Sequence, residues 1–225
     1  MNDESGATAS TRDVDTVVVI DDHPLFRKGV GQLLALDPGF ALVGEAGDGA
    51  AGVELVRALD PDLVLLDLNM RGMDGLQTLA AIKADMPHVR VVMLTVSDAR
   101  EDLIDAIRAG ADGYLLKDAD PEDVVERLRR ATAGELVVSD ALSGALAQAL
   151  RAEMRPAATG PAEHLTERER EILATLARGL SNKQIARELG IVEGTVKVHM
   201  KNLLRKLGLR SRVEAAVWAA RHGPA

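Results

Sequence analysis

Short apolar runs alternate with amphipathic helical patterns over the first 133 residues of the chain. The runs are rich in Val, Leu and Ile and lack polar alternation, which predicts strands that are buried on both faces of a sheet. They span residues 16–20, 40–44, 62–66, 89–95 and 113–116. Helices are predicted between and after them, at residues 24–36, 49–58, 75–84, 99–109 and 121–133. Five such units predict an α/β fold with a doubly wound, five-stranded parallel sheet.

Helices are also predicted beyond this pattern, the first at residues 139–152. From Leu165 onward the chain predicts helices alone, at residues 166–178, 182–189, 193–207 and 211–221. The helix at 139–152 begins after Ser139, a residue type that caps helices, and a segment with two prolines and a glycine, typical of a tether, follows it. We therefore expect a disordered tail at 1–15, an α/β domain at 16–134, a linker helix and tether at 135–163, and a small all-α domain at 164–225.

Charge is divided unevenly between the two predicted domains. Residues 1–150 contain 13 Lys and Arg and 27 Asp and Glu residues, a net charge of −14, whereas residues 151–225 contain 14 and 8, a net charge of +6. The net charge of −8 for the whole chain conceals this division. A basic helical domain joined to an acidic α/β domain is a candidate for binding nucleic acid.

The composition excludes several classes of site. The chain contains no cysteine, which excludes disulfides, thiolate catalysis and cysteine-based zinc sites. No apolar stretch approaches the roughly 18 residues that a membrane-spanning helix needs. Residues 1–15 are small and polar, without the apolar segment of a signal peptide. These features predict a location in the cytoplasm.

Four of the predicted strands end in residues suited to phosphoryl chemistry. Asp21 and Asp22 follow the first strand, Asp67 follows the third, Thr95 closes the fourth and Lys117 follows the fifth. The C-terminal ends of parallel strands share one edge of a sheet, where ligands bind. Three convergent carboxylates repel one another unless a cation joins them, and Mg²⁺ prefers such oxygen ligands. Any one of these residues alone is more often a turn or cap residue, so the joint pattern carries the prediction of a Mg²⁺ and phosphoryl site.

Within this site Asp67 is predicted to be the nucleophile, because the third strand is central in a five-stranded sheet. A carboxylate that attacks phosphorus forms an acyl phosphate. Lys117 and Mg²⁺ would stabilise the charge on the phosphoryl oxygens, and Thr95 would donate a hydrogen bond to them.

The segments around these residues resemble the response-regulator receiver family, whose fold is flavodoxin-like. The matching segments are the acidic pair, PDLVLLDLNMRGMDG around Asp67, VVMLTVS around Thr95 and GADGYLLKD around Lys117. The resemblance implies that Asp67 accepts a phosphoryl group from a phosphohistidine of a partner histidine kinase.

The same resemblance assigns roles to further residues. It implies that Mg²⁺ is held by Asp21, Asp22, Asp67 and the backbone carbonyl of Asn69. It also implies that Thr95 and Tyr114 form a switch pair, in which the hydroxyl moves toward the phosphoryl group and the aromatic ring turns inward. An ordinary half-buried strand residue is the alternative interpretation of Tyr114.

Residues 181–190 predict a short capped helix that ends at glycine, and a second helix follows from about Glu193. Two helices joined by a tight turn after a glycine are typical of a helix-turn-helix. The second helix is therefore predicted to be the one that enters the DNA groove.

The second helix has two distinct faces. Its apolar positions, beginning at Val196, form a stripe for the domain core. Lys197, Lys201 and Arg205 form a basic stripe at spacings of four residues, and Val198 lies roughly opposite the core stripe. An exposed apolar residue on a basic face suits contact with a thymine methyl group. A solvated helix with one exposed valine is the alternative.

The C-terminal segment resembles the LuxR-type DNA-binding domain, and with the receiver the chain resembles the NarL/FixJ family of response regulators. The matching segments are LTEREREIL, GLSNKQIARELGI, GTVKVHMKNLLRKLGL and SRVEAAVW. The resemblance implies that Lys197, Val198 and Lys201 face bases in the major groove. It implies phosphate contacts from Asn182, Lys183, Thr195 and Arg205. It also implies that the last helix pairs two copies on DNA through Val213, Ala216 and Val217, although some of these apolar residues must pack within the domain.

Two residues depart from the family pattern. Many members have Pro where this chain has Arg71, so the loop after Asp67 has more backbone freedom. Val192 stands next to the start of the second helix, where the family usually has Thr or Ser. Loss of an N-cap hydroxyl costs about 1 kcal/mol, so we expect this helix to begin less firmly.

The leading hypothesis is a two-component response regulator in which phosphorylation of Asp67 controls sequence-specific binding to double-stranded DNA. Phosphorylation would release the DNA-binding domain and favour a homodimer that binds paired half-sites. One alternative is a DNA-binding regulator that works without phosphorylation. Another is an aspartyl-phosphate phosphatase, which needs a second Asp where this chain has Asn69. Because that acid is missing, we expect a regulator and not an enzyme.

Overall fold

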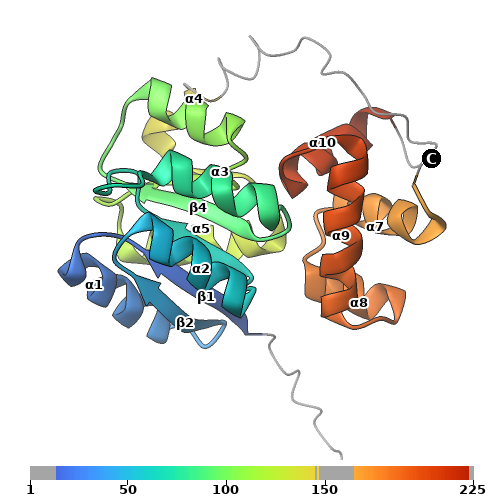
Figure 1. Cartoon of the computed structure of the whole chain (residues 1–225), viewed down its shortest axis with the longest axis horizontal. Coiled ribbons are helices and arrows are strands. Elements are labelled where there is room, and N and C mark those ends of the chain that lie inside the picture. The colour runs from blue at the N-terminus through green and yellow to red at the C-terminus, as the bar shows by residue number, and fades with distance from the viewer. Residues whose placement is uncertain (1–13, 145, 147–164, 223–225) are drawn as a thin grey trace, which may run out of the picture.

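The strands of the N-terminal half form one parallel sheet. The computed structural model describes residues 14–144, 146 and 165–222. The strands are β1 (Asp15–Ile20), β2 (Phe40–Ala46), β3 (Leu63–Leu66), β4 (Arg90–Thr95), β5 (Gly113–Leu116) and β6 (Val137–Val138). Their order across the sheet is β2-β1-β3-β4-β5-β6, and all neighbouring strands are parallel. β3 therefore lies in the interior of the sheet. Figure 1 labels β2, β1 and β4 of this sheet.

The predicted doubly wound sheet is confirmed, with one short strand added to its edge. β6 contains only Val137 and Val138, which pair with Gly113 and Tyr114 of β5. A two-residue strand is too short to produce a recognisable hydrophobic pattern, so the sequence did not predict it.

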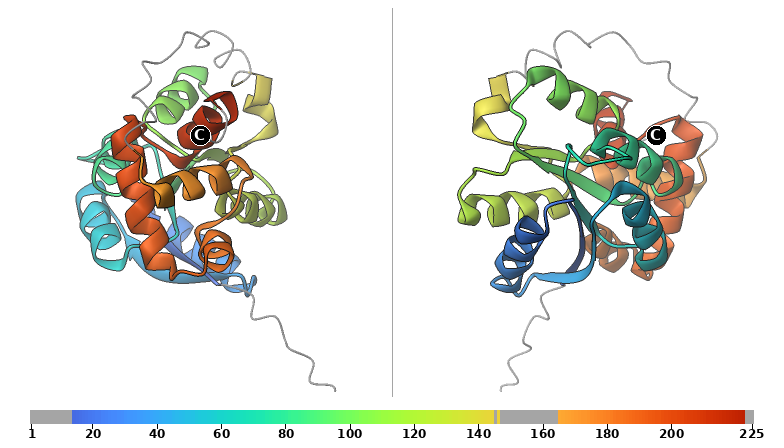
Figure 2. Two further views of the ribbon diagram at one scale, coloured as in Figure 1. Left: turned by 90° about the vertical axis from the view of Figure 1, so that its right-hand side faces the viewer. Right: turned by 60° about the vertical axis from the view of Figure 1, so that its left-hand side comes forward.

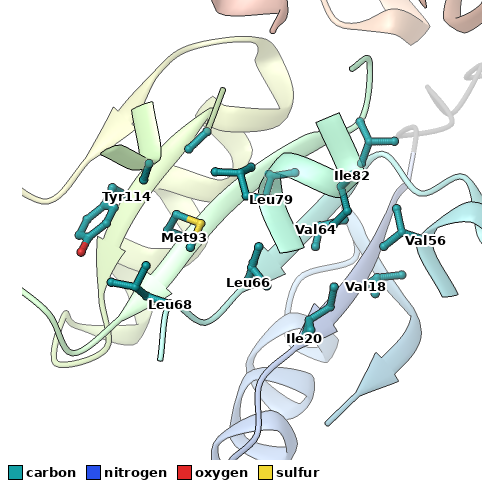
Figure 3. Packing of buried hydrophobic residues seen from close by; sticks show 14 of the residues in the cluster. Val18, Ile20, Val56, Val64, Leu66, Leu68, Leu79, Ile82, Met93 and Tyr114 are labelled. Carbon is teal, nitrogen blue, oxygen red and sulfur yellow. The ribbon is translucent and has the colours of Figure 1, made fainter. Parts of the chain in front are cut away.

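Helices cover both faces of the sheet. They are α1 (Pro24–Ala35), α2 (Gly49–Leu59), α3 (Gly75–Asp85), α4 (Arg100–Arg108) and α5 (Pro121–Ala133). Because successive strand residues point to opposite faces, each strand contributes to two apolar cores. The core on the side of α2, α3 and α4 includes Val18, Ile20, Val64 and Leu66 (Figure 3). On the other face of the sheet lie α1 and α5 (Figure 2). The core on that side includes Val17, Val19, Leu63 and Leu65.

The predicted helix boundaries agree with the structure to within one residue in this domain. Pro24 and Pro121 lie in the first turns of α1 and α5, where the missing backbone N–H removes no helical hydrogen bond. Gly134 ends α5 with a φ of 104°, a left-handed conformation that glycine adopts without strain.

The C-terminal domain contains four described helices, α7 (Glu167–Ala177), α8 (Asn182–Leu189), α9 (Glu193–Leu207) and α10 (Arg212–His222). α7 and α8 each begin with a capping box, formed by Thr166 with Glu169 and by Ser181 with Gln184. The predicted apolar stripe of α9 is confirmed, since its members are all buried in the domain core: Val196, Met200, Leu203, Leu204 and Leu207.

Some of the sequence predictions concern other parts of the chain. Residues 1–13 of the predicted tail, residues 145 and 147–152 of the predicted linker helix and the whole tether lie outside the described residues. Within the described ranges, no helix is long and apolar enough to cross a membrane.

Candidate phosphoacceptor site and DNA-binding surface

The carboxylates predicted to form the acidic site meet at the C-terminal edge of the sheet. Ligand atoms of Asp21, Asp22, His23 and Asp67 all lie within 4.8 Å of one another. Asp21 and Asp67 are each 2% exposed, because they directly follow the buried strands β1 and β3. Lys117 reaches into the same cluster, with its Nζ 2.7 Å from Asp21 Oδ2 and 3.0 Å from Asp67 Oδ2.

The electrostatics of this site suit a bound cation. Burial raises the pKa of Asp67, and the nearby charge of Asp21 raises it further, while Lys117 opposes both effects. The Oδ1 atom of Asp67 is buried and has no hydrogen-bond partner among the described residues. Hard carboxylate oxygens with a free lone pair are the ligands that Mg²⁺ takes in proteins, so the residues present fit that ion.

The loop after Asp67 brings the start of α3 very close to the site. A Cβ atom on Gly75 would lie 2.2 Å from the carbonyl oxygen of Asp67, so only glycine permits this approach. Asn69, which carries the predicted carbonyl ligand, and Arg71 are exposed residues of the same loop. The departure at Arg71 therefore leaves the carboxylate cluster in place.

Thr95 and Tyr114 are connected through Ser97. Thr95 is fully buried at the end of β4, and its Oγ1 accepts a hydrogen bond from the backbone N–H of Ser97 at 3.2 Å. The Tyr114 ring is fully buried in the core (Figure 3), and its hydroxyl donates to the carbonyl of Ser97 at 3.1 Å. Burial raises the pKa of Tyr114 to about 12, so the phenol stays protonated as a donor. The inward ring is the position that the family resemblance assigns to the phosphorylated form.

At the opposite edge of the sheet, α8 and α9 face the residues where the strands begin (Figure 1). The Nζ atom of Lys197, on α9, lies 2.7 Å from the carbonyl oxygen of Asp60, 3.4 Å from its Oδ2 and 3.6 Å from Asp62 Oδ1. Lys183, on α8, lies 3.0 Å from Asp15 Oδ1 and 3.6 Å from Asp62 Oδ2. Two residues predicted to contact DNA are thus held by carboxylates of the α/β domain.

The other predicted DNA contacts differ in accessibility. Val198 is 59% exposed, as its place opposite the core stripe predicts, and Lys201 and Arg205 are also exposed. Thr195 is half-buried. Asn182 is buried, and its Oδ1 accepts a hydrogen bond from Arg212 at 3.3 Å. The residues predicted to contact DNA are therefore only partly accessible in this arrangement of the two domains.

The predicted dimerisation residues lie on α10. Val217 is 47% exposed, whereas Val213 and Ala216 are half-buried. Pairing of two copies through this helix stays a prediction.

Sequence reasoning missed the acidic partners of the two lysines. Asp60 and Asp62 belong to the short connection between α2 and β3, where they resemble ordinary turn residues. The only signal available was the opposite charge of the two halves of the chain, which does not identify individual contacts.

Comparison with known proteins agrees with this geometry. The family profile for the response regulator receiver domain matches residues 17–129, and the profile for bacterial regulatory proteins of the luxR family matches residues 163–219. The nitrate/nitrite response regulator NarL of Escherichia coli K12 is 51% identical over 209 residues, covering 93% of this chain and 96% of NarL. This chain is a NarL/FixJ-family response regulator.

Two further relatives support the assignment of this response regulator to its family. NarP, a nitrate/nitrite response regulator of the same organism, is 53% identical over 201 residues. The matched region covers 89% of this chain and 92% of NarP. The solved receiver domain of NarL from Mycobacterium tuberculosis is 43% identical, with a TM-score of 0.50, and covers 52% of this chain and 94% of its own. All three relatives are response regulators by name, which agrees with the family predicted from the sequence.

The response regulator differs from the family pattern at the start of α9, as the sequence predicts. Val192 is the N-cap residue, forms no side-chain capping hydrogen bond and is 72% exposed. The helix that carries the predicted base contacts therefore lacks the side-chain cap that α7 and α8 possess.

Proposed function

We propose that phosphorylation of Asp67 by a sensor histidine kinase releases α8 and α9 from the receiver domain and so permits DNA binding. The observation that carries this proposal is the capture of Lys183 and Lys197 by receiver carboxylates. DNA binding depends on lysine and arginine side chains that can reach phosphates and bases. Lysines that are paired with Asp60 and Asp62 cannot contact DNA at the same time. The two domains must therefore separate before DNA binds.

The chemistry at Asp67 is the transfer of a phosphoryl group from nitrogen to oxygen. A carboxylate oxygen attacks phosphorus, the P–N bond of the donor phosphohistidine breaks, and the imidazole leaves with the electron pair and takes up a proton. The ammonium of Lys117, which lies 3.0 Å from Asp67, offsets the charge that collects on the phosphoryl oxygens. Mg²⁺ bound by Asp21, Asp22, Asp67 and the carbonyl of Asn69 would supply further positive charge.

A hydrophobic hollow beside the acidic site supports docking of a kinase. Its lining includes Leu25 and Phe26 of α1, Val96, which directly follows β4, and Lys117. Leu25 is 84% exposed and Val96 is 73% exposed, which is unusual for large apolar side chains gathered in one place. We infer that the kinase segment carrying the phosphohistidine rests its apolar side here, with the phosphoryl group directed at Asp67.

A chain of contacts leads from the site to the domain interface. Ser97, which is bonded to both Thr95 and Tyr114, also donates through its Oγ to Asp102 in the first turn of α4. At the other end of α4, the carbonyl of Arg108 accepts a hydrogen bond from Arg210 of the DNA-binding domain at 3.1 Å. Movement of the Thr95 hydroxyl toward a phosphoryl group would disturb Ser97, shift α4 and weaken the contact with Arg210.

Once released, the C-terminal domain would present its helix-turn-helix to DNA in the cytoplasm. Lys197, Val198 and Lys201 would face bases, and phosphate contacts would come from Asn182, Lys183, Thr195 and Arg205. A homodimer formed through Val213, Ala216 and Val217 would match paired half-sites.

Substitution of the proposed phosphoacceptor tests this function. Asp67→Asn should abolish labelling by a phosphodonor and the phosphodonor-dependent increase in DNA binding. Asp123→Asn, which removes an exposed carboxylate from the first turn of α5, is the matched control and should leave both unchanged. Labelling of the Asp67→Asn chain would contradict the proposal.

Assays on one preparation separate the alternatives. A regulator independent of phosphorylation would bind DNA equally well with and without phosphodonor. An aspartyl-phosphate phosphatase would turn over an external phosphate ester, and the position of its required acid is occupied by Asn69.

A further inference from the structure

Two carboxyl groups from different domains meet at the interface that holds α9. Glu193 is the first residue of α9, and Asp62 directly precedes β3. Contact with Asp62 raises the pKa of Glu193, and contact with Glu193 lowers the pKa of Asp62, so the two carboxyl groups lie close enough to share a proton. Two ionised carboxylates repel each other and have no proton to share, so this arrangement favours protonation of one of the pair.

The surroundings decide which of the two carries the proton. Asp62 accepts hydrogen bonds from the backbone N–H of Thr16 at 2.9 Å and from Thr16 Oγ1 at 2.8 Å. Lys183 and Lys197 each lie 3.6 Å from it. These donors and charges hold the pKa of Asp62 at about 2 despite its burial, so Asp62 is the carboxylate and the acceptor.

Glu193 has a less favourable environment for charge. Its Oε1 is buried and lacks a hydrogen-bond partner among the described residues. Burial and the adjacent Asp62 raise the pKa of Glu193 to about 7, against 4.5 for an ordinary glutamate. Lys183 and Lys197 oppose this effect only in part, because both are engaged with other carboxylates.

We propose that Glu193 is a protonation-dependent latch, which holds the DNA-binding domain closed on the receiver while it donates a hydrogen bond to Asp62. Loss of that proton places two negative charges against each other and favours separation of the domains. The inference rests on the proposed function, in which the closed arrangement withholds Lys183 and Lys197 from DNA. It adds a second input, pH, to the same equilibrium that phosphorylation controls.

The latch is surrounded by charged groups from several elements. Five charged residues act on Asp62 or Glu193 or lie beside them. They are Asp15 of β1, Asp60 of the α2–β3 connection, Arg90 of β4, Lys183 of α8 and Lys197 of α9. One histidine borders this group, with His88 Nε2 2.7 Å from Asp60 Oδ1. Histidine side chains as a class change charge close to neutral pH, so a test must separate any contribution of His88 from that of Glu193.

The direction of the pH effect follows from proton linkage. After separation Glu193 is in water with its ordinary pKa of 4.5, whereas in the closed form its pKa is about 7. The closed form therefore binds more protons, so its added stability is full below pH 4.5 and disappears as the pH rises through 7. Between pH 6 and pH 8 the ratio of closed to open molecules should fall about tenfold.

Single-molecule fluorescence measures this ratio without DNA or a phosphoryl group. The chain contains no cysteine, so dyes can be placed specifically with Ala35→Cys on α1 and Ala177→Cys on α7, both of which are exposed. The salt concentration is set so that closed and open molecules are both populated at pH 7, since salt weakens the ion pairs of the interface. The expected result is an approximately tenfold fall in the closed-to-open ratio between pH 6 and pH 8.

Three variants assign the effect to Glu193. Glu193→Gln keeps a donor at this position and cannot ionise, so its ratio should not change with pH. Glu167→Gln alters an exposed glutamate in the first turn of α7 and should retain the full tenfold change. His88→Asn should also retain it.

Two results would overturn the latch: a wild-type ratio independent of pH, or a Glu193→Gln chain that keeps the wild-type change. If Glu193→Gln does not fold, Asp62→Asn replaces it, because removal of the partner charge should make the change in the closed-to-open ratio smaller than in the wild type. If the closed-to-open ratio shows no effect of Glu193 but phosphorylation still separates the domains, the latch is wrong and the proposed function stands. A chain that responds to pH but not to phosphorylation contradicts the proposed function instead.

Discussion

Asp62 and Asp67 lie immediately before and after β3, at opposite edges of the sheet. Five residue steps of about 3.3 Å separate them by roughly 16 Å. One carboxylate holds lysines of the DNA-binding domain, and the other is the proposed phosphoacceptor. β3 is buried and hydrogen-bonded to a strand on each side, so it has little freedom to move. This favours α4 as the element that transmits a structural change from one edge of the sheet to the other.

Substitution of Asp62 should increase DNA binding by the unphosphorylated chain. Asp62→Asn keeps the shape of the side chain and can still accept hydrogen bonds from Thr16, but it removes the charge that attracts Lys183 and Lys197. Partly exposed ion pairs contribute about 0.2–1 kcal/mol each, so DNA affinity should rise about fivefold. Fluorescence anisotropy with operator DNA measures the effect. An affinity equal to that of the wild type would show that these pairs do not restrain the domain.

Mg²⁺ should change the titration of Asp67 in a predictable direction. Burial raises the pKa of this carboxyl above its ordinary value of 3.8, so without Mg²⁺ it should become protonated at a higher pH than an exposed aspartate. Bound Mg²⁺ favours the carboxylate and should lower the pKa of Asp67. Carboxyl carbon NMR follows both titrations, with the exposed Asp123 as an internal reference. A titration that Mg²⁺ leaves unaltered would argue against Asp67 as a ligand.

Tyr114 should contribute to stability mainly through its ring. Tyr114→Phe loses the hydrogen bond to Ser97 and should lower the free energy of unfolding by about 1 kcal/mol. Tyr114→Ala also leaves a cavity in the core, so the loss should be about 3–5 kcal/mol. Urea unfolding of the two variants compares these effects. Equal losses would mean that the ring contributes little to the packing.

The uncapped start of α9 gives a further opportunity for stabilisation. Val192→Thr supplies the missing N-cap hydroxyl and should stabilise the DNA-binding domain by about 1 kcal/mol. Val198→Thr, at another exposed valine within the same helix, is the control and should give no such gain. Thermal unfolding of both variants measures the difference. An unchanged melting temperature for Val192→Thr would show that the missing cap does not reduce the stability of the DNA-binding domain.

The sequence was most informative where local pattern and burial coincide. The apolar runs before Asp21, Asp67 and Lys117 predict buried parallel strands, and the common edge of such a sheet then brings their polar ends together. In the same way, the phase of α9 separates Val196 from Val198, and the structure confirms the buried and exposed positions.

The domain interface could not be predicted in this way. Lys197 and Asp60 are 137 residues apart, and their contact depends on how two separately folded domains pack. Opposite net charges favour association of the domains without choosing the residues. The carboxyl pair of Asp62 and Glu193 is further concealed, because both are acidic and by charge alone would be expected to avoid each other.

Phosphorylation at Asp67 is proposed to release the DNA-binding domain from Asp60 and Asp62. Single-molecule fluorescence between dyes at Ala35→Cys and Ala177→Cys tests it most directly, before and after treatment with a small-molecule phosphodonor. Wild-type molecules should move from the closed to the open distance on phosphorylation, whereas Asp67→Asn molecules should stay closed. A wild-type chain that is fully phosphorylated and still closed would contradict the proposed release.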